Sequence, residues 1–170
     1  MGLLHIYCGT GKGKTTAALG LAVRAAGAGM KICFVQLMKG KDTAELDILT
    51  RIPNMTVLRC DKHYGFTKHM DAAARTAITN CHNQLLSKVF SEPSYDMIIL
   101  DEFNCAYHAG LLHQTAAEQY ILRSGCNAEI ILTGRNPAPV FLDAADYISE
   151  IQCLRHPYKK GIPARKGIEY

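Results

Sequence analysis

The chain has 170 residues, 48% of them apolar and 20% charged, with a formal net charge of +4 and a pI near 8.7. These values predict one globular domain over residues 1–170 and exclude a low-complexity chain. They suit an anionic ligand better than nucleic acid, which usually requires a clustered basic face. Arg24 interrupts the most apolar helical stretch and no signal peptide precedes the first strand, so we expect a cytoplasmic protein that does not bind membranes.

Six short apolar runs recur along the chain, as expected of strands that are buried on both faces. They cover 3–8, 31–38, 55–60, 96–100, 128–134 and 147–151. Helical stretches separate them, the first over 15–27 and the longest over 69–90. The longest helix is predicted to bury the face formed by Met70, Ala74, Ala77, Cys81, Leu85 and Val89. This alternation predicts an α/β fold, a mostly parallel sheet with helices on both faces.

The stretch CGTGKGKTTAA (8–18) follows the first expected strand and opens the first helix, which is the context of a phosphate-binding P-loop. The standard spacing places a glycine five residues before Gly13, where this chain has Cys8. Gly9 can make the turn one residue later, and Gly11 adds flexibility. The loop N–H groups and the helix N-terminus are expected to surround a phosphate, with Lys14 as a point charge and the Thr15 hydroxyl suited to Mg²⁺.

Two acidic residues end the apolar run MIILDE (97–102), and a P-loop enzyme needs such a group at a strand end to hold Mg²⁺. Thr15, Asp101 and Glu102 are therefore the predicted metal ligands. Arg135 follows the next core strand and is expected at the same edge of the sheet, where ligands of such folds bind. The residues predicted to bind the nucleotide are Gly9, Thr10, Gly11, Lys12, Gly13, Lys14, Thr15, Thr16, Arg24 and Arg135.

Seven cysteines are scattered along the chain without a C-x-x-C pair: Cys8, Cys33, Cys60, Cys81, Cys105, Cys126 and Cys153. Their odd number and irregular spacing predict buried thiols in a reducing compartment, with no disulfide framework and no zinc or iron site. The histidines His63, His69, His82, His108 and His113 share no ligand spacing, and we expect them to be solvated or structural.

These motifs predict binding of ATP or GTP with Mg²⁺, but they do not name a reaction. One alternative is a phosphoryl-transfer enzyme or ATPase in which Glu102 activates water or a hydroxyl. Another is a regulatory nucleotide-binding module without chemistry.

Seven segments together resemble the ATP:corrinoid adenosyltransferases, from the first strand to the last residue: GTGKGKTTAALGLAVRAAG, VQLMKG, YGFT, IILDE, ILTGRN, DAADYISEI and HPYKKGIPARKGIEY. The resemblance implies a RecA-like fold, and it explains Cys8, since family members also carry a non-glycine residue there. It implies that the adenosyl group of ATP passes to Co(I) of a corrinoid, with release of tripolyphosphate.

The resemblance also implies functional residues and partners. Lys14, Thr15 and Glu102 would act on the triphosphate, and Phe66 would cover the lower face of the corrinoid during reduction of Co(II). A flavoprotein electron donor or corrinoid reductase and a homodimer are expected. Enteric members have a tryptophan where this chain has Lys68, and they carry a segment before the first strand, so corrinoid coverage is expected to differ.

Overall fold

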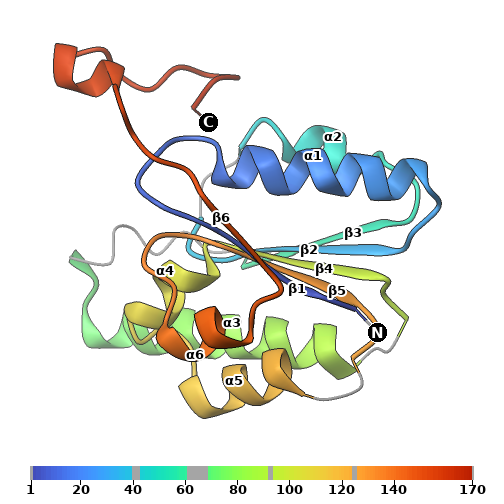
Figure 1. Cartoon of the computed structure of the whole chain (residues 1–170). Helices are drawn as coiled ribbons and strands as arrows, with labels where there is room; N and C mark the ends of the chain where they lie inside the picture. The colour runs from blue at the N-terminus through green and yellow to red at the C-terminus, as the bar shows by residue number, and fades with distance from the viewer. Residues whose placement is uncertain (1, 40–42, 61–68, 92–93, 124–125, 170) are drawn as a thin grey trace.

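The computed structural model describes residues 2–39, 43–60, 69–91, 94–123 and 126–169, and it is built on a six-stranded sheet (Figure 1). All neighbouring strands are parallel, in the spatial order β3-β2-β4-β5-β1-β6. The strands are β1 (Leu4–Cys8), β2 (Ile32–Gln36), β3 (Met55–Arg59), β4 (Met97–Asp101), β5 (Glu129–Thr133) and β6 (Tyr147–Glu150). The six predicted strands and the parallel α/β fold are confirmed.

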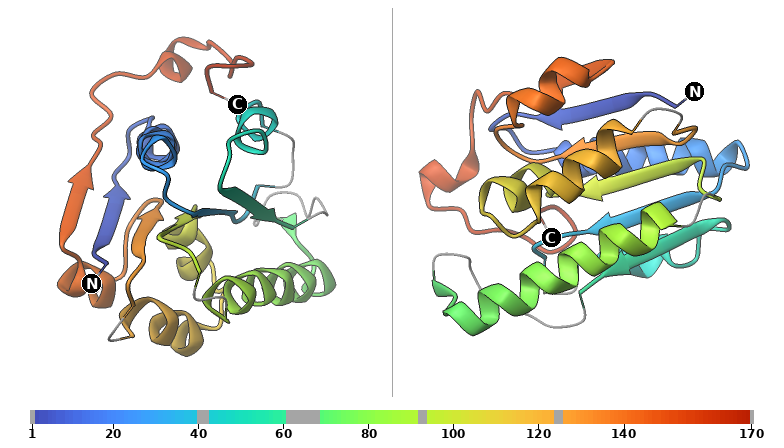
Figure 2. Two further views of the ribbon diagram at one scale, coloured as in Figure 1. Left: turned by 90° about the vertical axis from the view of Figure 1, so that its right-hand side faces the viewer. Right: turned by 90° about the horizontal axis from the view of Figure 1, so that it is seen from below.

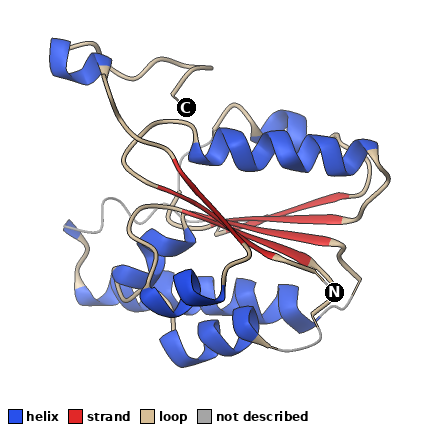
Figure 3. Ribbon diagram, in the orientation of Figure 1, coloured by secondary structure: helices blue, strands red, loops and turns tan. Residues whose placement is uncertain are grey.

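Helices cover both faces of this sheet, as Figures 2 and 3 show. One face carries α1 (Lys14–Gly27) and α2 (Leu46–Leu49). The other face carries α3 (Ala72–Ser91), α4 (Phe103–His108), α5 (Gln114–Leu122) and α6 (Pro139–Ala144), and a 3-10 turn, η2 (Pro157–Lys160), lies in the C-terminal tail. No helix in the described ranges is both long and apolar enough to cross a bilayer.

The core has one part on each face of the sheet, because successive side chains of a strand point to opposite faces. Phe34, Ile99 and Ile131 pack with α1, whereas Val35, Leu100 and Leu132 pack on the side of α3 to α6. Since the strands are parallel, Cys8, Gln36, Asp101 and Thr133 all lie at the same carboxyl edge.

The buried face of α3 differs from the predicted face. The buried residues are Ile78, His82, Leu86, Val89 and Phe90, whereas Ala77 is exposed. Of the predicted face only Val89 is fully buried, and the prediction missed the apolar Ile78, Leu86 and Phe90 as well as the completely buried His82. This error rotated the predicted face by roughly one residue around the helix.

Strand β6 departs from the expectation that all strands are buried on both faces. Its four residues are exposed, because it lies at the edge of the sheet and pairs with β1 alone within the described residues. The apolar run at 147–151 thus predicted the strand but not its surroundings.

The expectation of seven reduced thiols is wrong in this structure, which contains a disulfide between Cys60 and Cys81. The two cysteines are 21 positions apart, and the fold brings the end of β3 next to α3, with 6.1 Å between their Cα atoms. That separation is ordinary for a disulfide. The pairing depends on how a strand and a helix pack, so cysteine spacing alone did not indicate it.

Candidate active site

The glycine-rich loop connects β1 to α1 at the carboxyl edge of the sheet. Gly9 has a φ of +98°, and Gly13, the N-cap of α1, has a φ of +116°. Both values lie in the region that favours glycine. The turn expected at Gly9, one residue after Cys8, is therefore present. The helix begins at Lys14, so the positive end of its dipole and the free N–H groups of its first turn lie at this loop.

Gly11 has a role other than the flexibility expected from the sequence. Its N–H donates to the carbonyl oxygen of Ile151 at 2.7 Å, where the chain leaves β6. A Cβ atom at position 11 would lie 2.8 Å from the carbonyl oxygens of Ile151 and Gln152. No ordinary side chain tolerates such an approach to backbone, so Gly11 allows the segment after β6 to lie directly against the loop.

Two carboxylates end or follow β4, in different surroundings. Asp101 is completely buried, and its Oδ1 accepts hydrogen bonds from Thr15 Oγ1 at 2.8 Å and Thr133 Oγ1 at 2.7 Å. Glu102 has a φ of +60°, which is uncommon outside glycine, and its N–H donates to Thr133 Oγ1 at 2.9 Å. Thr133, at the end of β5, therefore fixes both acidic positions.

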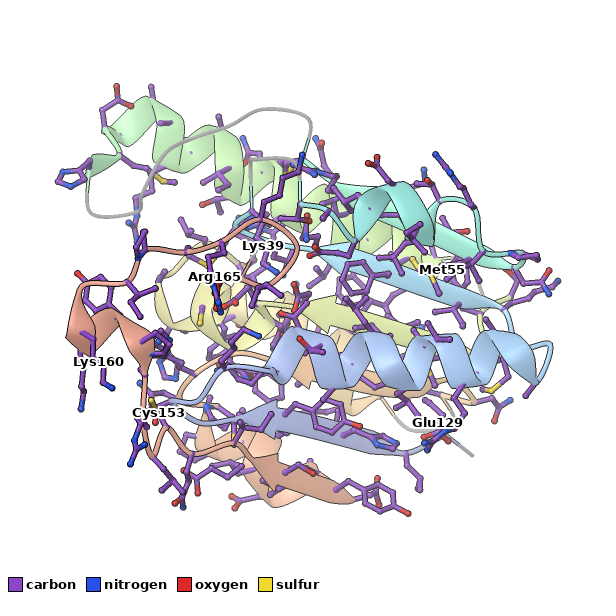
Figure 4. All side chains as sticks on the ribbon, turned by 90° about the horizontal axis from the view of Figure 1, so that it is seen from above. Lys39, Met55, Glu129, Cys153, Lys160 and Arg165 are labelled. Carbon is purple, nitrogen blue, oxygen red and sulfur yellow. A yellow bond between two sulfur atoms is a disulfide. The ribbon has the colours of Figure 1, made fainter. Side chains whose placement is uncertain are left out.

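Lys39 supplies a positive charge to this cluster. Its Nζ lies 2.8 Å from Asp101 Oδ2, and Glu45 Oε1 is 4.0 Å away. The side chain of Lys39 is 26% exposed, while that of Asp101 is fully buried. A buried carboxylate requires a cation and hydrogen-bond donors, and Lys39 with the two threonines meets that need. In Figure 4, which looks down on α1, the part of the tail that carries Arg165 crosses the view over Lys39.

Lys14 is held by its own loop. Its Nζ donates to the carbonyl oxygens of Gly9 at 2.9 Å and Gly11 at 2.7 Å. The ammonium group therefore lies within the curve of the loop, which is the position expected for a phosphate-binding lysine.

A cavity of about 560 Å³ opens at the loop, which is a usual size for a small-molecule site. Segments distant in the sequence form its wall, and the tail reaches over it after leaving β6 (Figure 1). The lining residues are Thr10, Gly11, Lys12, Gly13, Lys14, Thr15, Thr16, Leu19, Lys39, Ala44, Glu45, Glu102, Arg135, His156, Gly167, Ile168 and Glu169.

Most of the predicted site residues are brought together here. Those from Thr10 to Thr16, together with Glu102 and Arg135, line the cavity. Gly9 forms the turn at the base of the loop, and Asp101 lies buried beside Thr15. Arg24 is in the last turn of α1 and does not line the cavity, so the geometry gives its predicted nucleotide contact no support. Phe66 and Lys68 lie outside the described residues.

Several residues of this wall were not predicted from the sequence. Lys39 follows β2 by three positions and so lies at the same carboxyl edge as Asp101. A cation placed there was a usable signal, because ligands of parallel α/β sheets bind at that edge. The tail was part of the family resemblance, but its residues were given no place in the site. His156, Gly167, Ile168 and Glu169 reach the cavity only because the chain turns back after η2.

The buried His82 fixes the backbone before Lys39. Its Nε2 accepts a hydrogen bond from the Met38 N–H at 3.2 Å, so Nδ1 carries the proton and donates to the Leu111 carbonyl oxygen, also at 3.2 Å. Burial lowers the pKa of His82 to about 4, and the ring is neutral at pH 7. The expectation of a structural histidine is confirmed at this position.

Cysteine chemistry is not favoured near the cavity. Burial raises the pKa of the Cys105 thiol to about 11, and this thiol accepts a hydrogen bond from the Arg135 N–H at 3.4 Å. Burial also raises the pKa of Cys8, and the charge of Glu150 adds to the effect. Both side chains therefore remain neutral thiols at pH 7, and a thiol is a poor nucleophile and ligand compared with a thiolate.

The oxygen atoms around Asp101 suit Mg²⁺, which prefers carboxylate and hydroxyl oxygens and keeps several water molecules. Thr15 and Glu102 line the cavity, and the buried Asp101 accepts a hydrogen bond from Thr15. Gln36 is the register partner of Asp101, and its buried Oε1 has no hydrogen-bond partner among the described residues. An acceptor of this kind can receive a hydrogen bond from a metal-bound water. No group of three or more His, Cys, Asp or Glu in the described ranges forms a metal cluster.

Residues 1–170 match the family described as ATP:corrinoid adenosyltransferase BtuR/CobO/CobP. A corrinoid adenosyltransferase of Pseudomonas aeruginosa is 31% identical over 171 residues, which cover 99% of this chain and 84% of that protein. The corrinoid adenosyltransferase CobA of Salmonella typhimurium is 31% identical over 175 residues, which cover 99% of this chain and 86% of that protein.

Among solved structures, the cytoplasmic domain of EssC has a similar fold, with a TM-score of 0.59 and 18% sequence identity. The similarity covers 97% of this chain but only 34% of the EssC chain. At this identity, the likeness concerns the fold alone.

Proposed function

Because the chain belongs to the ATP:corrinoid adenosyltransferase family and adenosylates corrinoids with ATP in cobalamin biosynthesis or salvage, we propose that the cavity at the glycine-rich loop is its reaction site. In this reaction, Co(I) of the corrinoid attacks the 5′ carbon of ATP. A cobalt–carbon bond forms with both electrons from cobalt, which becomes Co(III). The bond from the 5′ carbon to oxygen breaks, and its electron pair leaves with tripolyphosphate.

This displacement needs no general base, because cobalt has no proton to lose. It requires positioning and neutralisation of the charge that builds up on the leaving tripolyphosphate. Lys14, the N–H groups at the start of α1 and Arg135 surround the cavity and suit that task. Thr15, Asp101 and Glu102 would hold Mg²⁺, which supplies further positive charge to the triphosphate when bound.

The observation that carries the proposal is the single cavity shared by the glycine-rich loop, Glu102 and Arg135, with the buried Asp101 bonded to Thr15. A loop of this kind can bind a triphosphate through its main-chain N–H groups, and Glu102 lines the same cavity while Asp101 lies behind Thr15. The two elements of the predicted site would thus act on one ligand.

The direct test is the identity of the inorganic product. Anaerobic incubation with ATP, Mg²⁺ and chemically reduced cobalamin should give tripolyphosphate and adenosylated corrinoid in equal amounts, measured by phosphorus NMR and the visible spectrum. ADP with orthophosphate would favour the ATPase or kinase alternative, in which Glu102 activates water or a hydroxyl.

Our proposal includes a role for Phe66, although this residue lies outside the described ranges. It would fill the lower face of the corrinoid, so that Co(II) loses its axial donor and its reduction potential rises. We also propose a cytoplasmic homodimer that accepts electrons from a flavoprotein or corrinoid reductase.

The Phe66→Ala variant separates these steps. It should lose most activity when the assay starts from Co(II) corrinoid with a mild flavoprotein reductant, and keep most activity when Co(I) is supplied chemically. Lys14→Ala should fail in both assays. An equal loss for Phe66→Ala in both assays would remove its role in cobalt activation.

A further inference from the structure

The ammonium group of Lys39 lies among the oxygen atoms that we assign to the metal. Its Nζ is 2.8 Å from Asp101 Oδ2 and 3.4 Å from Thr15 Oγ1. The other carboxylate oxygen of Asp101 already accepts hydrogen bonds from Thr15 and Thr133. Both oxygens of this buried carboxylate thus accept hydrogen bonds from protein donors.

The fold fixes the backbone that carries this lysine. Met38 has a φ of +59° and donates its N–H to the buried His82. The N–H of Lys39 donates to the Leu37 carbonyl oxygen at 2.7 Å, and Arg59 Nη2 donates to the Lys39 carbonyl oxygen at 3.5 Å. The ion pair with Asp101 therefore comes from a backbone held at several points.

A divalent cation and this ammonium group exclude each other. Mg²⁺ bonds to oxygen at roughly 2.0–2.1 Å, so an ion bound to Thr15 or Asp101 would come within a few ångströms of Nζ. Two positive charges at that distance repel strongly in a half-buried site. Metal binding thus requires Lys39 to leave Asp101.

From this geometry we infer that Lys39 is a built-in cation that occupies the metal position until nucleotide and metal enter together. Lys39 lines the same cavity as Lys14 and Arg135, so the triphosphate offers its ammonium group a new anionic partner. Asp101 and Thr15 would then be free to hold the metal, while Lys39 adds to the positive charge around the leaving group. The inference rests on the proposed metal site and predicts that metal alone binds poorly.

Metal binding without nucleotide tests this inference. Mn²⁺, which replaces Mg²⁺ at such sites, is titrated into the protein, and free Mn²⁺ is measured by electron paramagnetic resonance. Lys39→Met should bind one Mn²⁺ at least ~10-fold more tightly than the wild type, a usual size for coupling between sites. Lys39→Arg, which keeps the charge, should remain within about threefold of the wild type.

Lys12→Met is the matched control, because Lys12 lines the cavity but is not among the donors to Asp101 in the described part of the chain, which are Thr15, Lys39 and Thr133. It removes the same charge and should change Mn²⁺ affinity less than about threefold, since an exposed charge is screened. Equal affinities for Lys39→Met and Lys12→Met would overturn the role of Lys39. If tripolyphosphate still forms in that case, the proposed adenosyl transfer stands without it.

The melting temperature is a second measurement, which applies even if Lys39→Met is less stable than the wild type. Lys39→Met leaves the Asp101 carboxylate buried without its cation, so its melting temperature should fall and should recover with millimolar Mn²⁺. The wild type should show little response to Mn²⁺ alone. Adding Asp101→Asn to Lys39→Met should abolish both the tight binding and the recovery. Persistence of tight binding in that double variant would place the metal elsewhere and overturn the proposed metal site together with the inference.

Discussion

Lys14 and Thr15 are neighbours on the first turn of α1, yet they contact different parts of the site. Lys14 bonds to the carbonyl oxygens of the glycine-rich loop, and Thr15 bonds to the buried Asp101. Lys14 thus lies where we propose that the phosphates bind, and Thr15 lies at the proposed metal position. Their removal should impair the same step for different reasons.

Lys14→Ala and Thr15→Ala should each lower turnover at least ~10²-fold, the usual effect of removing one group that stabilises developing charge. Cys8→Ser is the control, since the turn depends on Gly9, and its effect should be small. Rates are measured with chemically supplied Co(I), so that cobalt reduction is not limiting. Full activity of Lys14→Ala would contradict the assignment of the site.

Thr133 positions both acidic residues through one hydroxyl, which donates to Asp101 and accepts from the Glu102 N–H. Thr133→Val keeps the shape but loses both hydrogen bonds, so activity should fall by roughly 10–100-fold and more Mg²⁺ should be required for half-maximal rate. Thr133→Ser should restore most of the activity because it restores the hydroxyl. An unchanged Mg²⁺ dependence in Thr133→Val would show that this hydroxyl does not support the metal site.

At the scale of elements, the contact between the glycine-rich loop and the chain after β6 makes position 11 sensitive. Gly11→Ala would bring its Cβ within 2.8 Å of two carbonyl oxygens, so the loop must shift. We expect lower thermal stability and at least a ~10-fold higher KM for ATP, because the N–H groups of the loop lose their alignment.

Gly20 in α1 provides the matched control. A Cβ there meets no atom within 4 Å, and alanine favours the helix. Gly20→Ala should therefore raise stability by about 0.5–1 kcal/mol without changing KM. In thermal unfolding, we expect Gly11→Ala to lower the melting temperature and Gly20→Ala to raise it. Stabilisation by both would show that the loop tolerates a side chain.

The link between α3 and the chain after β2 depends on a neutral His82. Its pKa is about 4 in the folded protein and about 6.5 in the unfolded chain. The unfolded chain thus binds more protons between these values, and the free energy of unfolding rises with pH across that window. The contribution is complete above pH 6.5 and is lost by pH 4, a difference of about 3 kcal/mol.

His82→Gln cannot titrate and should lack this part of the pH dependence. Urea unfolding from pH 4 to pH 7 should show the wild type losing about 3 kcal/mol more than the variant as the pH falls. His113→Asn, at an exposed position, should follow the wild type. Parallel profiles for the wild type and His82→Gln would mean that another group controls acid stability.

The sequence predicted the elements better than their contacts. Apolar runs located all six strands, and the glycine spacing located the loop, because both patterns are local. The buried face of α3 was predicted about one residue away from its true position, since the adjacent apolar pairs Ala77–Ile78 and Leu85–Leu86 fit either face and the buried His82 resembles a surface residue in a hydrophobicity pattern. The disulfide and the Lys39–Asp101 pair were missed because each joins elements that meet only after the sheet assembles. The loop residues, and Glu102 and Arg135 at the ends of neighbouring strands, were found, whereas contacts that depend on how a helix or the tail packs were not.

At the scale of the whole molecule, the C-terminal tail contributes to the site more than to the core. Its residues are mostly exposed, yet His156, Gly167, Ile168 and Glu169 line the cavity. Deletion of residues 155–170 should therefore leave the melting temperature within a few degrees of the wild type, because little apolar area is lost. The KM for ATP or corrinoid should rise at least ~10-fold. If the shortened protein unfolds cooperatively at a much lower temperature, the tail stabilises the fold.

The position of β1 in the sheet sets the order in which the protein can assemble during translation. Its register partners are in β5 and β6, and contacts such as His5–Glu129 and Leu4–Asp146 join residues 124 and 142 positions apart. Strands β2, β3 and β4 pair among themselves and can form first on the ribosome. Strand β1 is synthesised before β2, β3 and β4 but finds its partners only after them, so its apolar side chains stay accessible to chaperones in the meantime. Since the glycine-rich loop follows that strand, a nascent chain acquires its nucleotide site only when β5 and β6 have emerged.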